Sequence, residues 1–172
     1  MLTPTLLCTS DALAKLERER YRARRAKKPI DAGDHIYNFC ITALAVRDYA
    51  FSYSALSQES RQAFHDKWSR QPHLAACSEI ANSSKHCTLR NAARTRGALL
   101  AEVDLADFVE LPSGEATAII RRLQPTIEIE LANGEVINAD ELMTCIMGFM
   151  VGYLMASGIP VTQQSPDQLA TP

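Results

Sequence analysis

The feature of this sequence that most constrains its fold is a change of hydrophobic period near Gly97. Before that point, apolar residues recur with the i, i+3, i+4, i+7 spacing of helices that bury one face. After it come shorter β-favouring runs, which end in the alternating segment 126–131 and in an Asn133-Gly134 pair typical of a hairpin turn. A last apolar helix follows. The sequence therefore predicts a mainly α (α+β) protein: an up-and-down helical bundle of about four to five helices, with a small antiparallel β-hairpin or sheet inserted before the C-terminal helix.

Capping residues and prolines predict where these elements begin and end. Ser10 or Asp11 caps the first helix, Asp31 or Asp34 begins the second and Asp140 caps the last. We expect helices over 10–28, about 31–51, 58–70, 73–87 and 140–157, and strands over 99–109, 116–123 and 126–131. With 172 residues the chain has the size of one domain, which we place at 1–159 with a β insertion at 97–138. The Gln- and Pro-containing end, 160–172, is predicted to be a disordered tail.

The C-terminal helix allows two interpretations. Residues 142–161 contain no charged side chain and include Gly148 and Gly152, a spacing found where membrane helices pack closely. One interpretation is a membrane-associated helper anchored by this segment. The internal glycines, Pro160 and the absence of flanking Lys or Arg favour the other, a central bundle helix that is buried on most sides. In that case truncating Phe149 to alanine should cost about 3–5 kcal/mol.

Charge is distributed unevenly along the chain. The formal net charge is -2, but residues 15–28 contain eight basic and two acidic residues, so that this segment is +6 and the remainder -8. We expect a mostly exposed basic helical arm over 10–28. It would contact RNA, or lie on an acidic face of this or another subunit, through Arg24, Arg25, Lys27 and Lys28, unless it is simply solvated.

The most distinctive polar pattern lies on the helix predicted over 73–87. Helical spacing places Glu79, Asn82 and His86 along one stripe, with Lys85 beside it. In a ribonuclease, His86 would remove the proton of a 2′-hydroxyl and Lys85 would stabilise the phosphate. The structural alternative is that Asn82 and His86 bond to the backbone or to Asp48 and orient two helices.

Three residues of the second helix are expected to face this stripe. His35, Asn38 and Thr42 lie on the less apolar side of that helix, which predicts a groove between the second and fourth helices. A solvated face explains the same pattern. The candidate binding residues are therefore Asn82, Lys85, His86, His35, Asn38, Asp48, Arg24, Arg25, Lys27 and Lys28.

The helix order and three short motifs carry a resemblance to a known family. Tyr37-Asn-Phe-Cys40 and Arg47-Asp48 on the second helix, and Ile80-Ala-Asn-Ser-Ser-Lys-His86 on the fourth, resemble bacterial HEPN-like helical-bundle proteins over about residues 35–155. The resemblance implies a helical bundle that acts as a dimer, and for many members RNA cleavage without a metal through an Arg followed four to six residues later by His. That motif is absent here, so the resemblance transfers no catalytic residue.

The cysteines predict a reducing compartment. Their number is five and their spacing is scattered, and three fall inside apolar helical patterns where a thiol packs as a small hydrophobic group. The His73-x-x-x-Cys77 pair is a weak metal motif, and we expect neither metal nor cofactor. The N-terminus lacks the basic region of a secretion signal, which favours a cytoplasmic protein.

These observations predict a non-catalytic HEPN-like interaction or regulatory protein in bacterial or phage defence or counter-defence. It would bind a protein partner or itself as a homodimer, with RNA as an alternative partner of the basic helix. A divergent metal-independent ribonuclease using Asn82, Lys85 and His86 is the second hypothesis, and the membrane-associated helper is the third.

Overall fold

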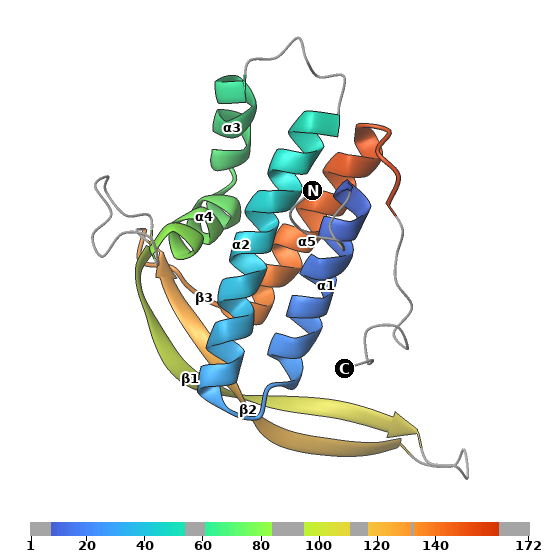
Figure 1. The fold of residues 1–172 in the computed structure, drawn as a ribbon. Helices are drawn as coiled ribbons and strands as arrows, with labels where there is room; N and C mark the ends of the chain where they lie inside the picture. Colours follow the sequence, from blue (N-terminus) through green and yellow to red (C-terminus); the bar gives the residue numbers. More distant parts are fainter. Residues whose placement is uncertain (1–7, 54–60, 84–94, 111–116, 132, 162–172) are drawn as a thin grey trace.

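The computed structural model describes residues 8–53, 61–83, 95–110, 117–131 and 133–161. These residues form a helical bundle with a long β-ribbon at one end (Figure 1). The described elements follow the order α1 (Thr9–Arg25), α2 (Pro29–Tyr53), α3 (Arg61–Ser69), α4 (Pro72–Ser83), β1 (Thr95–Glu110), β2 (Thr117–Leu131), β3 (Val136–Asn138) and α5 (Ala139–Ala156). The predicted fold class, a mainly helical bundle with a small antiparallel sheet before the last helix, is confirmed.

The helices α1, α2 and α5 run side by side and enclose most of the core (Figure 1). α2 contributes the i, i+3, i+4 residues that its periodicity predicts, with Ile36, Phe39, Cys40, Ala43 and Val46 all buried. Because these residues lie on one face of a 25-residue helix, α2 can contact α1, α4 and α5 along its length.

α1 is not the mostly exposed arm that its charge suggested. Ala12, Leu13, Leu16 and Ala23 are buried against the bundle, and so is the charged residue Glu19. A helix with this many charges can pack because its apolar residues occupy one narrow stripe, while the basic residues lie along its sides and at its end.

α3 is attached to the bundle by a cluster of aromatic rings. The ring of Phe64 lies 5.1 Å from that of Phe51 in α2, 5.6 Å from that of Trp68 in α3 and 6.0 Å from that of Tyr153 in α5. Trp68 also meets Phe149 edge to face at 5.4 Å. Such tilted and edge-to-face pairs are the favoured ring geometries, so that two buried residues fasten this short helix to two others.

α5 has two faces, which corrects the expectation that it is buried on most sides. Its inner face is in the core, and the buried residues are Ala139, Leu142, Met143, Ile146, Met147, Met150 and Leu154. Its outer face, which includes Thr144, Cys145, Gly148, Gly152 and Met155, is exposed. Among the residues that the structure describes, Ala139–Ala156 is also the one helix long and apolar enough to cross a membrane.

The sheet contains longer strands than predicted. The segments 116–123 and 126–131 are one continuous strand, β2, which pairs with β1 in antiparallel register from Thr95↔Leu131 to Glu110↔Thr117. Pro125 lies inside β2, in the part that the three-residue strand β3 does not reach. The predicted hairpin turn is confirmed: Gly134 has φ +84°, and its N–H donates to the Leu131 carbonyl at 2.9 Å.

Several predicted boundaries move by a few residues. α1 ends at Arg25, and α2 starts earlier than predicted because Pro29 occupies its first turn, where no N–H partner is needed. The cap of α5 is Asn138, which accepts from the Glu141 N–H at 2.8 Å, rather than Asp140. Pro160 and Val161 do not belong to a disordered tail, since the Pro160 carbonyl accepts from Ser10 Oγ at 2.8 Å and Val161 packs against the core. The remainder of that predicted tail, 162–172, lies outside the described residues.

Candidate functional site: the groove between α2 and α4

A groove does separate α2 from α4, but with other walls than predicted. It is a cleft of about 360 Å³, lined by Ile41, Leu44, Ala45, Arg47 and Asp48 from α2 and by Ser78, Ala81 and Asn82 from α4. The structure therefore brings together Asn82 and Asp48, two of the candidate binding residues. His35, Asn38 and Thr42 are not among the residues that line it.

The groove combines apolar and polar walls. Leu44, Ala45 and Ala81 are at least half buried, while the exposed Ile41 lies at the edge. The Asn82 side chain donates to Ser78 Oγ at 3.4 Å, one turn away on α4. The exposed surface of the groove is mainly polar, so amide, hydroxyl and charged groups are what it offers to a segment of another molecule.

A charged cluster lies where the groove meets α3. Asp48 Oδ1 accepts from Arg47 Nε at 3.1 Å and lies 3.0 Å from Arg47 NH2 and 3.4 Å from His65 Nε2. The Arg47 side chain is only 16% exposed, so this pairing holds its guanidinium in one place. His65 is a residue of this cluster that the sequence did not single out, because its partner lies 17 positions earlier in a different helix.

Lys85 and His86 follow the end of α4 at Ser83 and lie outside the described residues. The structure consequently neither adds them to the groove nor excludes them from it.

His35 and Thr42 face α1 instead of α4. His35 Nδ1 lies 2.9 Å from Glu19 Oε2, while Arg22 NH1 lies 3.1 Å and Lys15 Nζ 3.9 Å from Glu19 Oε1. We call these four residues the Glu19 cluster. Beside it, buried Thr42 accepts from Lys15 Nζ at 2.8 Å, and its own hydroxyl donates to the carbonyl of the exposed residue Asn38 at 2.7 Å. These side chains hold α1 against α2, which removes His35 and Thr42 from the groove.

The four candidate cations of the basic segment lie at the corner between α1 and α2. Two of them, Arg24 and Arg25, contact other side chains. The Arg25 guanidinium stacks on the Tyr21 ring at 4.9 Å and donates to its hydroxyl at 2.6 Å. Arg24 Nε lies 3.2 Å from Asp140 Oδ1 in the first turn of α5. Lys27 and Lys28 are exposed. We call Arg24, Arg25, Lys27 and Lys28 the basic corner.

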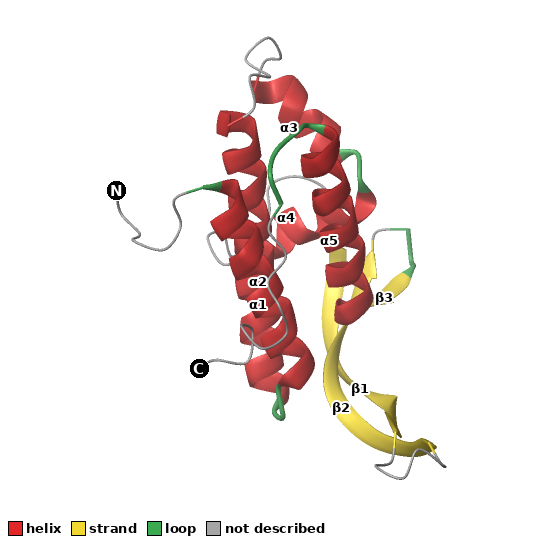
Figure 2. Cartoon of the chain, turned by 90° about the vertical axis from the view of Figure 1, so that its right-hand side faces the viewer, coloured by secondary structure: helices red, strands yellow, loops and turns green. Residues whose placement is uncertain are grey.

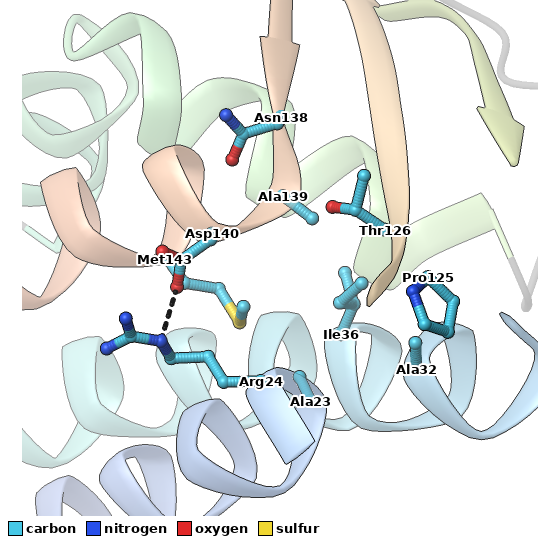
Figure 3. A pocket seen from close by; sticks show the side chains of 10 residues that line it. All are labelled: Ala23, Arg24, Ala32, Ile36, Pro125, Thr126, Asn138, Ala139, Asp140 and Met143. Atoms are coloured by element: carbon cyan, nitrogen blue, oxygen red, sulfur yellow. Dashed lines mark ion pairs between the residues drawn. The ribbon is translucent and has the colours of Figure 1, made fainter. Parts of the chain in front are cut away.

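A small cavity lies behind the Arg24–Asp140 pair. It holds about 90 Å³ and is lined mainly by small and apolar residues from α1, α2, β2 and α5, including Ile36, Pro125 and Met143 (Figure 3). Figure 3 shows Arg24 reaching across to Asp140 on one side of this space. The pair therefore joins the end of α1 to the start of α5, which makes part of the basic corner structural.

In the His73-Cys77 motif, Cys77 packs in the core. Cys77 is fully buried, and its thiol donates to the Cys40 carbonyl at 3.6 Å. The hydrogen bond with the Cys40 side chain and burial raise the pKa of Cys77 well above its usual value, so the thiol stays protonated and packs as an apolar group. In the described part of the chain, no three His, Cys, Asp or Glu side chains are grouped as metal ligands.

Comparisons with known proteins found no relative of this chain. No protein-family model, no curated protein and no solved structure matches the chain.

Proposed function

We propose that this chain is a non-catalytic, HEPN-like interaction protein that binds a segment of a protein partner in the groove between α2 and α4. The observation that carries the proposal is the groove itself, in which the ordered Arg47–Asp48 pair and Asn82 lie beside Leu44, Ala45 and Ala81. Polar groups held in this way can form the hydrogen bonds of a protein interface, and arginine is enriched in such interfaces. The resemblance to HEPN proteins extends the proposal to bacterial or phage defence or counter-defence.

The charged cluster gives the groove a fixed polar end. Arg47 and His65 both lie against the carboxylate of Asp48, which holds their side chains in position. A protein segment that enters the groove would cover the exposed Ile41 side chain. Burial of this apolar surface would contribute roughly 25 cal/mol per Å² to the free energy of binding. Its polar groups would meet Asn82 and Ser78.

We predict that Ala45→Arg removes partner binding, because the long charged side chain fills the groove from its α2 wall. Asn38→Arg is the matched control, since it adds the same charge to an exposed position of the same helix outside the groove. Tagged parent and both variants are expressed in the native host, and co-purifying proteins are quantified by mass spectrometry. A partner thus identified is then purified and titrated against each variant. We expect the parent and Asn38→Arg to bind equally and Ala45→Arg to bind at least about tenfold more weakly, about 1.4 kcal/mol.

Two outcomes of this experiment would contradict the proposal. A partner that binds all three proteins alike would place its site elsewhere on the molecule. If no protein co-purifies in stoichiometric amount with the parent, the proposal of a protein partner is wrong.

A divergent ribonuclease is the second candidate function, favoured by the position of Asn82 in the groove, three residues before Lys85. We expect the parent protein not to cleave RNA in the presence of EDTA. The assay compares the parent with Lys85→Ala and His86→Ala and records a melting curve for each. Cleavage by the parent that either substitution abolishes, with an unchanged melting curve, would establish the nuclease instead.

The same RNA samples test the basic corner. Lys27→Glu/Lys28→Glu is preferable to a reversal of all four cations, because Arg24→Glu would place a carboxylate beside Asp140. If the corner binds RNA, the double variant should lose affinity and the parent should bind more weakly as salt rises. Binding by the parent that is insensitive to both changes would exclude the corner as the RNA site.

A further inference from the structure

A small cavity adjoins the groove, between α2, α3 and α4. It holds about 10 Å³, and three of its lining residues, Leu44, Arg47 and Ser78, also line the groove. Trp68 of α3 lines it as well, and we call it the Trp68 cavity. α3 is at the end of the helical bundle away from the β-ribbon (Figures 1 and 2). A space of this size accommodates about one water molecule, or one oxygen atom of a larger ligand.

The indole N–H of Trp68 is the most distinctive polar group of this cavity. The Trp68 residue is only 2% exposed, and its Nε1 has no hydrogen-bond partner among the described residues. An indole N–H can only donate, and buried polar groups of this kind normally have a partner, because a buried donor without an acceptor costs free energy. A ligand that supplies an acceptor would therefore remove this cost.

Two neighbouring side chains provide further donors. Arg47 contacts Asp48 through Nε and NH2, while its NH1 makes no hydrogen bond or ion pair with a described residue. Ser78 Oγ accepts from Asn82, which leaves its hydroxyl hydrogen available to donate. The one carboxylate that lines the groove, that of Asp48, is already shared by Arg47 and His65. The junction of the groove and the Trp68 cavity is therefore rich in donors and poor in acceptors.

We infer that the partner segment carries an aspartate or glutamate whose carboxylate lies between Arg47 and Trp68. The inference rests on the proposed function and names the chemistry of the segment that the groove would bind. A carboxylate matches these two residues because it only accepts hydrogen bonds, whereas both of them only donate. It also has the charge that is opposite to that of Arg47, and hydrogen bonds to ionised groups are roughly twice as strong as neutral ones.

The size of the cavity limits how such a segment would lie. Because the Trp68 cavity has room for only about one oxygen atom, a single carboxylate oxygen would enter it. The remainder of the segment would stay in the groove. A basic or entirely apolar segment would leave the Trp68 N–H without an acceptor.

The probe for this inference is a library of short random peptides displayed on phage. The library is selected for binding to the full-length parent and counter-selected against Ala45→Arg, so that only peptides that need the groove remain. We expect the selected peptides to share an aspartate or glutamate. Trp68 is the single tryptophan of the chain, so its fluorescence reports on the cavity. A bound synthetic peptide should shift its emission, because the indole N–H gains an acceptor.

Two substitutions test the donors separately. Trp68→Phe removes the N–H and keeps an aromatic ring, and Arg47→Gln removes the charge. Arg70→Gln is the matched control, since it removes the same charge from an exposed position just beyond the end of α3. Each protein is titrated with a selected peptide and with the same peptide carrying alanine in place of its acidic residue. Melting curves show whether each variant is folded.

With the acidic peptide, we expect Trp68→Phe and Arg47→Gln each to raise the dissociation constant about tenfold and Arg70→Gln to leave it within about twofold. With the alanine peptide, the parent and the three variants should bind alike. If Trp68→Phe does not fold, the comparison of Arg47→Gln with Arg70→Gln decides the inference.

Three outcomes would overturn the inference. Selected peptides that need the groove but no acidic residue would do so and would leave the proposed function in place. Equal weakening of both peptides by Trp68→Phe and Arg47→Gln would mean that these residues act only through the fold. Failure to select any peptide would also contradict the inference, whereas the proposed function is tested separately by co-purification of a partner.

Discussion

Replacing Phe64 by alanine is expected to lower the free energy of unfolding by about 3–5 kcal/mol, the largest effect that we predict for a single substitution. Phe64 is fully buried, and its ring contacts those of Phe51, Trp68 and Tyr153 from three helices. The substitution removes the apolar area of the ring and leaves a cavity that three rigid rings cannot fill. Urea unfolding followed by circular dichroism measures the loss.

Phe149→Ala serves as the comparison, because Phe149 belongs to the same ring cluster but is only partly buried. Because part of the Phe149 ring is already exposed, we expect a smaller loss there than at Phe64. An equal or greater loss for Phe149→Ala would mean that the rings around Phe64 close over its cavity, so that burial in the native state does not rank these two sites.

The second large effect is expected at Glu19, where alanine should lower the free energy of unfolding by about 1–3 kcal/mol. The carboxylate is 7% exposed and lies against Lys15, Arg22 and His35, so its loss leaves Arg22 and His35 without their acceptor and Lys15 without its ion-pair partner. The side chains of those partners are 29–44% exposed and can turn toward water, which keeps the cost below that of a fully buried ion pair.

Glu17→Ala is the matched control for this prediction. Glu17 lies one residue before Arg18 on the same helix, is partly exposed and makes no ion pair among the described residues. Thermal and urea unfolding of both variants at low and high salt distinguish the two positions: Glu19→Ala should melt earlier than Glu17→Ala under both conditions. If the two variants unfold alike, the Glu19 cluster is a solvated set of charges that does not stabilise the packing of α1 against α2.

Local patterns in the sequence correctly predicted the elements in which they occur. The apolar spacing of residues 36–51 predicted the buried face of α2, and Asn133-Gly134 predicted the turn between β2 and β3. Both depend on interactions within a few residues: a helix repeats its direction every 3.6 residues, and glycine adopts the positive φ that the turn requires. The continuous strand through Pro125 was missed because proline usually interrupts a strand, and only the position of β3 shows that its missing N–H is on an open edge.

The tertiary structure decided which charged and polar residues pair with each other. His35 was expected to face α4 and instead pairs with Glu19, 16 positions earlier, while Arg24 pairs with Asp140, 116 positions later. The hydrophobic periodicity and the charge pattern identify which residues share a helix face. The helix that packs against that face is determined by how all the apolar faces are buried together. The sequence by itself thus determined the helical class, the place of the β insertion and two members of the groove, Asp48 and Asn82. The packing of α1, α2 and α4 decided the rest, because a short-range polar contact forms only after the apolar faces have set which helices are neighbours.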